Sequence, residues 1–480
     1  MRSISLPNLT LAIAVAAILC ACGGNGRLAS SPGLPTMLSS QGKIQHIVII
    51  VQENRTFNNL FYGYPGAKTA TYGYDSSGQK IELQPVTIAT TWDLQHNARG
   101  YMLSCNGTGK KIAGTDCRMN GFDKEKWYCG HGGSEPKCPK GVKYPPYAYV
   151  PHDQTAPYFS MAQQYVLADE MYASDFDISS FISHQYIIAG VNPDKTFDYP
   201  DNQGQWGCPA APGVQVPVLG PDRNIGGSKG VFPCWNPPGG TLGDELDNKG
   251  LSWAFYAVPL KAKGSGSGKL CGSGTESDGN GYRSAIWSAY QAIEHICYGK
   301  DWDNDVKSPP QRFLSDVKGG NLAAVTWVTP TYQNSDHGGN GSPTGPSWVS
   351  SLVNAVGESQ FWNSTAIFIF WDDPGGWYDP EPPAYVDNDG LGYRLPLLII
   401  SPYAKQGLVS HTHYEHGSIL RFVEDQFGLA RLSASDARAK SPADAFDFNQ
   451  SPRKFVPIKS KYGAEYFMNQ PLDTRPPDSD

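Results

Sequence analysis

The sequence predicts an α/β fold, with a largely parallel sheet flanked by helices and loop-rich insertions pinned by disulfides. Short, nearly continuous apolar runs recur along the chain, and stretches with helical periodicity lie between them. Strands that are buried on both faces have such continuous apolar sequences, and crossover helices join parallel strands. With 40% hydrophobic and 17% charged residues, the chain can also bury a large core and is unlike a disordered protein.

The expected elements alternate from residue 44 onward. Strands are predicted at 44–51, 251–258, 322–328, 365–371 and 395–400, and helices at 157–165, 284–296, 348–356 and 416–427. Residues 62–150 and 196–282 interrupt this alternation, because they hold Gly, Pro, Cys and aromatic residues with little periodicity. We therefore predict a single α/β domain over 43–432 with two insertions. A polar extension over 433–480 follows it.

The cysteines indicate an oxidising compartment. Eight of the ten lie between residues 105 and 297: Cys105, Cys117, Cys129, Cys138, Cys208, Cys234, Cys271 and Cys297. Four disulfides are the default in an exported protein, although the sequence cannot assign the pairs. A zinc–thiolate site is the rival interpretation, but the chain has no CxxC pair. We expect the disulfides to staple the long insertions.

The N-terminus is typical of an export signal. Arg2 precedes an apolar run over 9–19, which is too short to span a bilayer but fits a signal peptide over 1–22. The segment around Ala21 and Cys22 resembles a bacterial lipobox, so Cys22 is the expected lipidated residue, with an ordinary cleaved signal as the alternative. Residues 23–42 are expected to be a flexible tether. The mature protein would be periplasmic, anchored to the outer membrane or secreted.

The charge balance bears on partners. The formal net charge is −7, a mildly acidic balance that still leaves room for a local basic site. Proteins that bind nucleic acid generally show a basic stripe, so we expect no nucleic-acid partner. The sequence gives no indication of the oligomeric state.

Polar residues follow three of the predicted strands. Glu53 and Asn54 come after the first strand, and the pair Asp372 and Asp373 follows the strand at 365–371. A third segment, with Asp336 and His337, follows the strand at 322–328 through a proline turn. Ligands bind beyond the carboxyl ends of strands in such sheets. Adjacent carboxylates with an amide oxygen suit a divalent cation, so we predict a shared metal site.

Serine and histidine residues supply further candidates. The segment 173–190 contains Ser179, Ser180 and Ser183, and nothing local selects a nucleophile among them. The chain has no GxSxG elbow there, which argues against an α/β-hydrolase. Three histidines follow the strand at 395–400, and we expect at least one of them in the cleft. These three are His411, His413 and His416. His96 and His184 are further cleft candidates.

Several motifs resemble one known family. QENRTFNNLFYGYPG (52–66) is similar to the ENRSFD-x-x-FG opening of the bacterial phosphoesterases that include phosphatidylcholine-type phospholipases C and respiratory-burst-inhibiting acid phosphatases. WDDPGGWYDPEPP (371–383) resembles the family's DEPGGFYDHVPPP block, and SDHGG (335–339) resembles its SDHPP. Segments 158–176 and 411–429 resemble the stretch before the nucleophile and the closing block. The matches follow the family order over 44–430.

The resemblance implies a fold and a nucleophile. The family has an alkaline-phosphatase-like core, and its acid-phosphatase branch carries the nucleophile in a GGSFLNHQY-like turn. The segment SSFISHQY (179–186) looks like this turn and places Ser180 at the nucleophile. The chain departs from the family at Ser183, where the family has Asn, at Pro380, where it has His, and at Asn58, where it has Asp.

The resemblance also implies a chemistry. A divalent cation, whose identity the sequence does not reveal, would be held by Glu53, Asn54, Asp372 and Asp373 beside the nucleophile. Ser180 would attack phosphorus and form a phosphoserine. His337 would donate a hydrogen bond or a proton to the leaving oxygen. Asn54 is expected to be a catalytic residue as well as a metal ligand.

Three functions remain open from the sequence. The SFxxHQY form favours an acid-phosphatase-like hydrolase of small phosphate monoesters. A phospholipase C that cleaves phospholipid headgroup diesters is the close alternative, with membrane association through a lipid anchor on Cys22. A non-catalytic surface lipoprotein on the same fold is the third. A sulfatase is not supported, because the turn at Ser180 lacks the C/S-x-P-x-R motif.

Overall fold

The computed structural model describes residues 42–129, 138–176, 179–192, 207–210, 213, 215–216, 220, 222–223, 230–259, 269–272, 286–473 and 475. All of these belong to one compact unit, residues 40–480. The predicted signal peptide, Cys22 and nearly all of the predicted tether lie outside the described residues, as does much of the insertion at 196–282.

A single large sheet forms the centre of the described structure. Its nine strands are ordered β10-β9-β11-β1-β12-β13-β8-β14, with β15 also pairing β8. All neighbouring strands are parallel except β13, which runs antiparallel to both β12 and β8. The strands are β1 (His46–Gln52), β8 (Val166–Tyr172), β9 (Trp253–Tyr256), β10 (Val306–Lys307), β11 (Val325–Val328), β12 (Thr365–Trp371), β13 (Arg394–Ile400), β14 (Leu408–Ser410) and β15 (Tyr414–Glu415). This arrangement confirms the predicted α/β class.

All five predicted strands are present, but the sequence prediction missed β8, which lies between β13 and β14. Its sequence, VLADEMY, carries two acids within an otherwise apolar run. Both acids have partners: Asp169 accepts hydrogen bonds from the Lys68 amide and from His411, and Glu170 accepts one from Tyr172. A buried strand tolerates acids whose oxygens are satisfied in this way.

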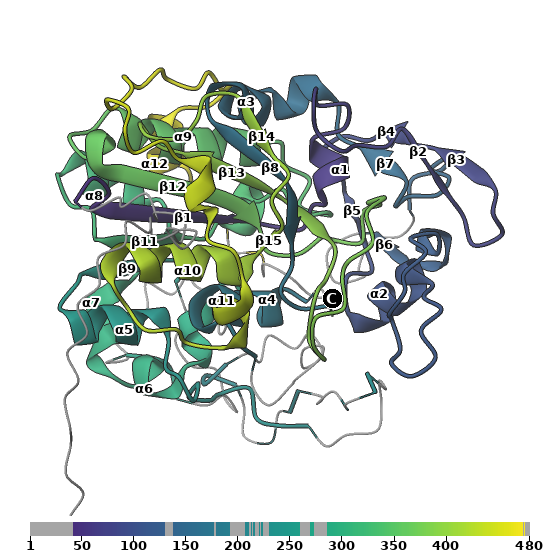
Figure 1. Cartoon of the computed structure of the whole chain (residues 1–480), viewed down its shortest axis with the longest axis horizontal. Helices are drawn as coiled ribbons and strands as arrows, with labels where there is room; N and C mark the ends of the chain where they lie inside the picture. Colours follow the sequence, from purple (N-terminus) through teal and green to yellow (C-terminus); the bar gives the residue numbers. More distant parts are fainter. Residues whose placement is uncertain are drawn as a thin grey trace, which may run out of the picture. The chain divides into compact units, whose positions relative to one another are not determined.

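Helices cover both faces of the sheet (Figure 1). On one face lie α3 (His152–Gln164), α8 (Arg312–Lys318), α9 (Gly345–Gly357) and α12 (Ala464–Asn469). On the other lie α4 (Ser180–Ala189), α5 (Leu242–Lys249), α6 (Glu294–Cys297), α7 (Lys300–Asp305), α10 (His416–Phe427) and α11 (Ala434–Arg438). The predicted helices over 157–165, 348–356 and 416–427 fall on α3, α9 and α10.

The predicted helix over 284–296 was wrong. In the described part of that range, the chain forms a 3-10 turn at Ala289–Ala292 and then enters α6 at Glu294. Ile293 between them is extended, because it forms a parallel bridge with Trp235 from the second insertion. Tertiary pairing here overrides the local helical pattern.

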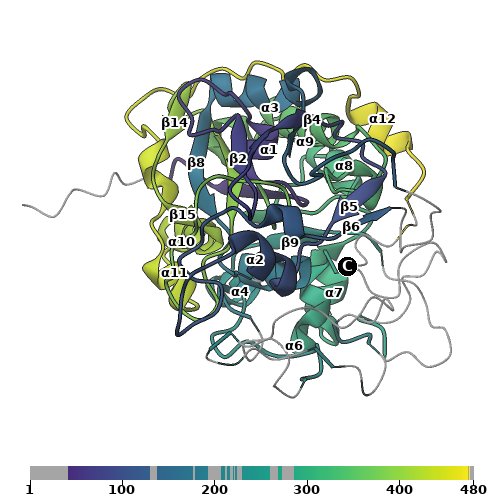
Figure 2. The ribbon, with the colours of Figure 1, turned by 90° about the vertical axis from the view of Figure 1, so that its right-hand side faces the viewer.

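The first insertion builds a small layer of its own. It contains β2 (Tyr72–Tyr74), β3 (Lys80–Glu82), β4 (Gln84–Pro85), β5 (Trp92–Leu94), α2 (Ala98–Cys105), β6 (Trp127–Cys129) and β7 (Ala148–Tyr149). The strands pair as β2–β3, β4–β7 and β5–β6. These elements and the short helix α1 (Phe57–Leu60) gather beyond the end of the sheet at which β1 ends, and they face the viewer in Figure 2.

The predicted disulfides are confirmed. The pairs are Cys105–Cys117, Cys129–Cys138, Cys208–Cys234 and Cys271–Cys297. Each bond closes a short loop inside or next to one of the two insertions. The first two bonds staple the first insertion outside the main core, whereas Cys208, Cys271 and Cys297 are themselves buried in the main core.

The segment after residue 432 packs against the core in its described part. Phe467 on α12 contacts the ring of Trp348 on α9, and Phe455 lies against Trp362 and the backbone of Gly357. Among the described residues, no helix has both the length and the apolar character needed to cross a membrane.

Candidate active site

The ends of two neighbouring strands bring the first acids together. Gln52 at the end of β1 lies opposite Trp371 at the end of β12, so Glu53 and Asp372 emerge side by side. The Asp372 amide donates to the Gln52 carbonyl at 3.0 Å, and the Asn54 amide lies 3.3 Å from Asp372 Oδ1. The predicted convergence of these two segments is therefore present in the structure.

The nucleophile candidate comes from a third segment. Ser180 is the first residue of α4, and its Oγ donates a hydrogen bond to Asp373 Oδ2 at 2.9 Å. His184 lies one helical turn later, on the same side of the helix. Its Nε2 is 3.1 Å from Glu53 Oε1 and 3.5 Å from Asp372 Oδ2. All five side chains are at most 1% exposed.

A glycine turn after β12 holds this arrangement. Gly375 has φ +61°, and a Cβ there would lie 2.3 Å from the carbonyl oxygen of Asn54. The Gly375 amide also donates to Asp373 Oδ1 at 2.8 Å. Only glycine adopts this backbone at no cost while approaching another main chain so closely. The turn therefore fixes Asp373 relative to Asn54.

Buried polar atoms test whether a cation fits here. Within the described residues, both side-chain amide atoms of Asn54 are buried without a hydrogen-bond partner, and the contact of Asp372 Oδ2 with His184 Nε2 is 3.5 Å long. Glu53, His184 and Asp372 each offer one ligand atom, and these atoms lie within 4.8 Å of one another. Burial would raise the pKa of Asp372, but the hydrogen bond and charge of His184 outweigh it, so the pKa lies below its usual value. An anionic, oxygen-rich set of this kind suits a divalent cation.

Asp373 differs from its predicted role as a metal ligand in one respect. Its two carboxylate oxygens accept hydrogen bonds, one from the Gly375 amide and one from Ser180. The sequence analysis predicted His184 as one of several histidines in the cleft and gave it no role of its own. Its spacing of four residues from Ser180 was the signal that could have placed it beside the carboxylates.

A second cluster of possible ligand residues joins the first insertion to the segment after β11. Asp93, His96 and His337 also present ligand atoms within 4.8 Å of one another. The rings of His96 and His337 meet edge to face with centroids 5.3 Å apart, and His337 Nδ1 lies 3.6 Å from Asp93 Oδ2. Asp93 was not predicted, because it sits in an insertion without periodicity and no motif marks it.

Shared packing links the two clusters. Gly376 packs so closely on β5 that a Cβ there would lie 2.7 Å from Leu94 Cβ, two residues before His96. From the other side, Trp287 stacks near His337, with ring centroids 5.9 Å apart, and belongs to the same apolar cluster as Phe181. Gly376 thus connects the segment of Asp372 and Asp373 to that of His96, and Trp287 connects the segment of Ser180 to His337.

Asp336 is placed as a scaffold residue. Its Oδ2 accepts hydrogen bonds from Tyr158 Oη at 2.7 Å and from Trp371 Nε1 at 3.2 Å, and its carbonyl accepts one from Arg55 Nε. Burial raises the pKa of Asp336 to about 6, and the Tyr158 hydrogen bond and the Arg55 charge oppose this rise. Asp336, predicted as a cleft residue, therefore holds Tyr158, Arg55 and the last residue of β12, Trp371, in place.

The three histidines of HTHYEH separate. His411 and His413 are about half exposed, and they pair with Asp169 and Glu170 on β8 rather than with the acids after β1 and β12. His416 is 1% exposed, and the neighbouring charge of Asp372 acts on it. Burial lowers the pKa of His416 to about 4, although Asp372 opposes the shift. Of the three, His416 is the one beside the cluster.

Two of the three departures from the family pattern, Asn58 and Ser183, have structural partners of their own, and the residue before the third is paired. Asn58 accepts a hydrogen bond from the Ala70 amide at 2.7 Å, and Ser183 Oγ lies 3.2 Å from both carboxylate oxygens of Asp175. Asp379, which precedes Pro380, forms a buried two-point ion pair with Arg394 at 3.0 and 3.1 Å.

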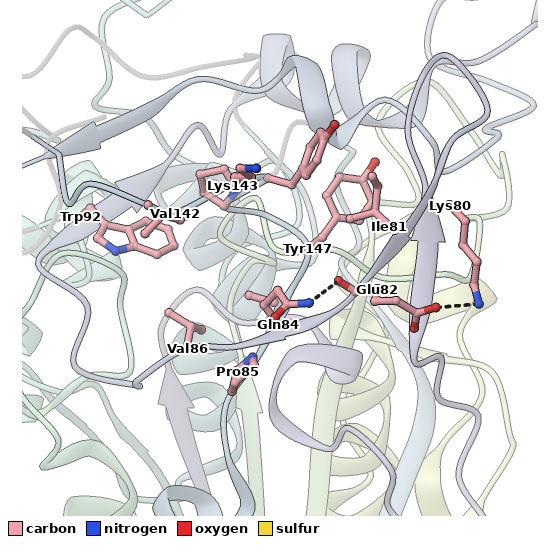
Figure 3. Close-up of a pocket in the computed structure, with 14 residues that line it drawn as sticks. Lys80, Ile81, Glu82, Gln84, Pro85, Val86, Trp92, Val142, Lys143 and Tyr147 are labelled. Carbon is pink, nitrogen blue, oxygen red and sulfur yellow. Dashed lines mark hydrogen bonds and ion pairs between the residues drawn. The ribbon is translucent and has the colours of Figure 1, made fainter.

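A separate cavity of about 490 Å³ lies in the first insertion (Figure 3). It is bounded by Trp92 and Val142 on one side and by the Lys80–Glu82 ion pair on the other. None of the predicted site residues lines it. Trp92 immediately precedes Asp93, so the cavity borders the second cluster only through this residue.

Comparison with known proteins identifies the family. A family model described as "Phosphoesterase family" matches residues 44–430. The chain belongs to the Phosphoesterase family. Its relatives include Phospholipase C A of Mycobacterium tuberculosis, 22% identical over 458 residues that cover 86% of this chain and 79% of that protein. Hemolytic phospholipase C of Pseudomonas aeruginosa is 24% identical over 471 residues, covering 84% of this chain and 56% of its own length.

Solved structures show a weaker likeness. A protein in the Alkaline Phosphatase Superfamily from Vibrio parahaemolyticus has 11% identity and a TM-score of 0.36, with 86% of this chain and 76% of that chain covered. The family match confirms the resemblance found in the sequence motifs. Together with the phospholipase C relatives, it shows that the chain is a phosphoric-ester hydrolase.

Proposed function

We propose that the enzyme cleaves phosphate esters through a phosphoserine intermediate on Ser180. The observation that carries this proposal is the hydrogen bond from Ser180 Oγ to Asp373 Oδ2 at the start of α4. A serine becomes a useful nucleophile when a base lies within hydrogen-bond reach. The amino end of a helix also attracts phosphate oxygens through its backbone amides and dipole, which would orient the ester for attack.

The proposed reaction has two balanced steps. Ser180 Oγ forms a bond to phosphorus as its proton passes to Asp373, while the bond to the leaving oxygen breaks and that oxygen takes a proton from His337. Water then attacks the phosphoserine and gives a proton to His337. Ser180 leaves as the alcohol and recovers its proton from Asp373, so the free enzyme is restored.

A divalent cation fits the acids beside the nucleophile. Glu53, Asn54 and Asp372 would hold it, with His184 next to them and Asp373 at its border with Ser180. When bound, such a cation neutralises phosphate oxygens and favours the ionised form of the attacking hydroxyl. His184 keeps Glu53 and Asp372 together through its Nε2.

Two substrate classes follow from different observations. The acid-phosphatase-like form of the Ser180 segment favours small phosphate monoesters, and the place of His184 beside Glu53 gives the histidine of that form a role. The relatives named phospholipase C favour phospholipid headgroup diesters as the second candidate.

Paired substrates distinguish these candidates. Hydrolysis of p-nitrophenyl phosphate and of p-nitrophenylphosphorylcholine would be followed for the wild type, Ser180→Ala and the control Ser183→Ala. Monoester turnover lost only in Ser180→Ala supports the acid-phosphatase-like enzyme. A preference for the choline diester, with the same mutational pattern, supports phospholipase C. Turnover that survives in Ser180→Ala contradicts the proposed nucleophile. Folded wild type without turnover of either ester contradicts both substrate classes and indicates a narrower natural substrate.

We also propose that the enzyme is exported and anchored by a lipid on Cys22. The apolar run at 9–19 and the lipobox-like segment that follows it support this proposal. Cys22→Ala should move the protein from the membrane fraction to the soluble exported fraction, whereas the matched Cys20→Ala should not. Membrane association that is unchanged in Cys22→Ala would contradict the anchor.

A further inference from the structure

We propose that Asp93, from the first insertion, is a positioning residue that keeps His337 available as the proton donor to the leaving oxygen. This inference rests on the proposed phosphoserine mechanism and adds a residue that acts through its acid, His337. Asp93 Oδ2 lies 3.6 Å from His337 Nδ1, and the side chains are 13% and 2% exposed. The pair joins the insertion to the loop after β11, so the insertion would complete the site.

The Asp93 carboxylate is fixed in place. Its Oδ1 accepts a hydrogen bond from the Leu94 amide at 2.9 Å. On the other side it lies against the main chain of Gly338, where an added Cβ would approach Oδ1 to 2.2 Å. The residue after His337 must therefore be glycine for Asp93 to approach the imidazole.

The hydrogen bond of His337 decides which ring nitrogen carries the proton when the imidazole is neutral. Nδ1 lies 2.5 Å from the carbonyl oxygen of Gly338, and only a protonated nitrogen can donate to that acceptor. The neutral ring then carries no proton on Nε2 and can only accept there. His337 can donate through Nε2 only as an imidazolium ion.

A buried imidazolium needs a compensating charge. His337 is 1% exposed and is packed among the rings of Trp287, Tyr332 and His96. Desolvation in such a site disfavours the charged ring, and a carboxylate at 3.6 Å favours it. Asp93 thus supplies the charge that makes Nε2 a donor. The buried Arg55 also interacts with Asp93, so the carboxylate is shared between two cationic partners.

A cation bound by Asp93, His96 and His337 is the rival interpretation. Both imidazoles use Nδ1 toward a backbone carbonyl, since His96 Nδ1 lies 2.6 Å from Leu94 O. A cation would therefore have to bind through the Nε2 atoms. Asp93 instead approaches His337 on the Nδ1 side, and this geometry favours a charge pair over a shared metal.

Leaving-group dependence tests the assignment. Phosphoryl transfer to the enzyme would be measured in single turnovers with aryl phosphates, from 2,4-dinitrophenyl phosphate, whose phenolate leaves without a proton, to phenyl phosphate, which needs one. His337→Ala should lose about 10²–10⁴-fold with phenyl phosphate and little with the dinitrophenyl ester. Asp93→Asn, which keeps the shape but removes the charge, should lose about tenfold or more in the same pattern.

Controls separate the other outcomes. Asp123→Asn changes an acid of the same insertion that binds Ser76 and should leave the pattern unaltered. Equal losses in Asp93→Asn for every ester would overturn the proposal, because a purely structural defect does not depend on the leaving group. Loss of an equivalent of bound metal in Asp93→Asn would overturn it in favour of the cation. If Ser180→Ala still transferred phosphate, the proposed mechanism itself would fail, and this result is distinct from either outcome.

Discussion

Ser180 Oγ and Asp373 Oδ2 lie 2.9 Å apart, although the two residues are separated by 193 positions in the chain. The serine begins helix α4, and the acid follows strand β12. Their contact gives the serine hydroxyl a proton acceptor within a group of buried acids. The predictions below test what this contact and its surroundings do.

Asp373→Asn should reduce kcat by about 10²–10⁴-fold, because an amide can accept the Ser180 hydrogen bond but cannot take its proton. Folding should be retained, since the Gly375 amide can still donate to the substituted side chain. Steady-state kinetics with circular dichroism as a folding control check this. An Asp373→Asn enzyme with wild-type kcat would show that Asp373 is not the acceptor.

Removal of a divalent cation should abolish turnover. The acids and the unpartnered side-chain amide of Asn54 predict one tightly held ion. Asp372→Asn should lower the metal content, because it reduces the negative charge of the ligand set. Elemental analysis of purified enzyme, before and after treatment with EDTA, measures this directly. The His295→Ala variant controls for loss of an exposed imidazole elsewhere. Full activity after EDTA in a protein without bound ion would exclude the cation.

Gly375→Ala should damage both stability and activity. The left-handed backbone costs about 1–2 kcal/mol for alanine, and the approach to the Asn54 carbonyl adds a clash. Displacement of Asp373 by about 1 Å would reduce kcat by roughly 10²-fold. Gly463→Ala is the matched control, because its added methyl meets no atom within 4 Å. Thermal unfolding and kinetics should separate the two variants; equal behaviour would contradict the role of the turn.

Glu424 should make the enzyme less stable as the pH rises. Burial and the neighbouring Asp436 carboxylate raise the pKa of Glu424 to about 8. A raised folded-state pKa gives stability that is complete below the unfolded value of 4.5 and is lost as the pH rises through about 8. Tm should therefore fall between pH 5 and 8, and less in Glu424→Gln than in the wild type. The exposed Glu465→Gln should keep the wild-type slope, and an unchanged slope in Glu424→Gln would contradict the assignment.

The sequence predicted the parts of the site that sit directly after apolar strands. Glu53 and Asp372 each follow an uninterrupted buried run, and neighbouring strands bring such positions together without further information. The motif match then selected Ser180 among three serines, and the structure places its hydroxyl on Asp373.

The remainder depended on long-range contacts. Strand β8 was missed because the partners that satisfy Asp169, such as His411, are distant in sequence. The spacing of HTHYEH could not show that His416 is the one of the three that interacts with the charge of Asp372, because His411 follows β14 and pairs with β8 instead. Asp93 lies in an insertion held by its own disulfides and short strands, and no periodic pattern reports where such a segment docks.

The central claim, that Ser180 carries the phosphoryl group, is tested most directly by trapping the intermediate. Enzyme mixed with p-nitrophenyl phosphate would be quenched in acid within one turnover and digested, and its peptides would be mapped by mass spectrometry. The account predicts one added phosphoryl group on Ser180, absent from Ser180→Ala and retained in Ser183→Ala. A phosphoryl group on another residue, or turnover by Ser180→Ala, would contradict it.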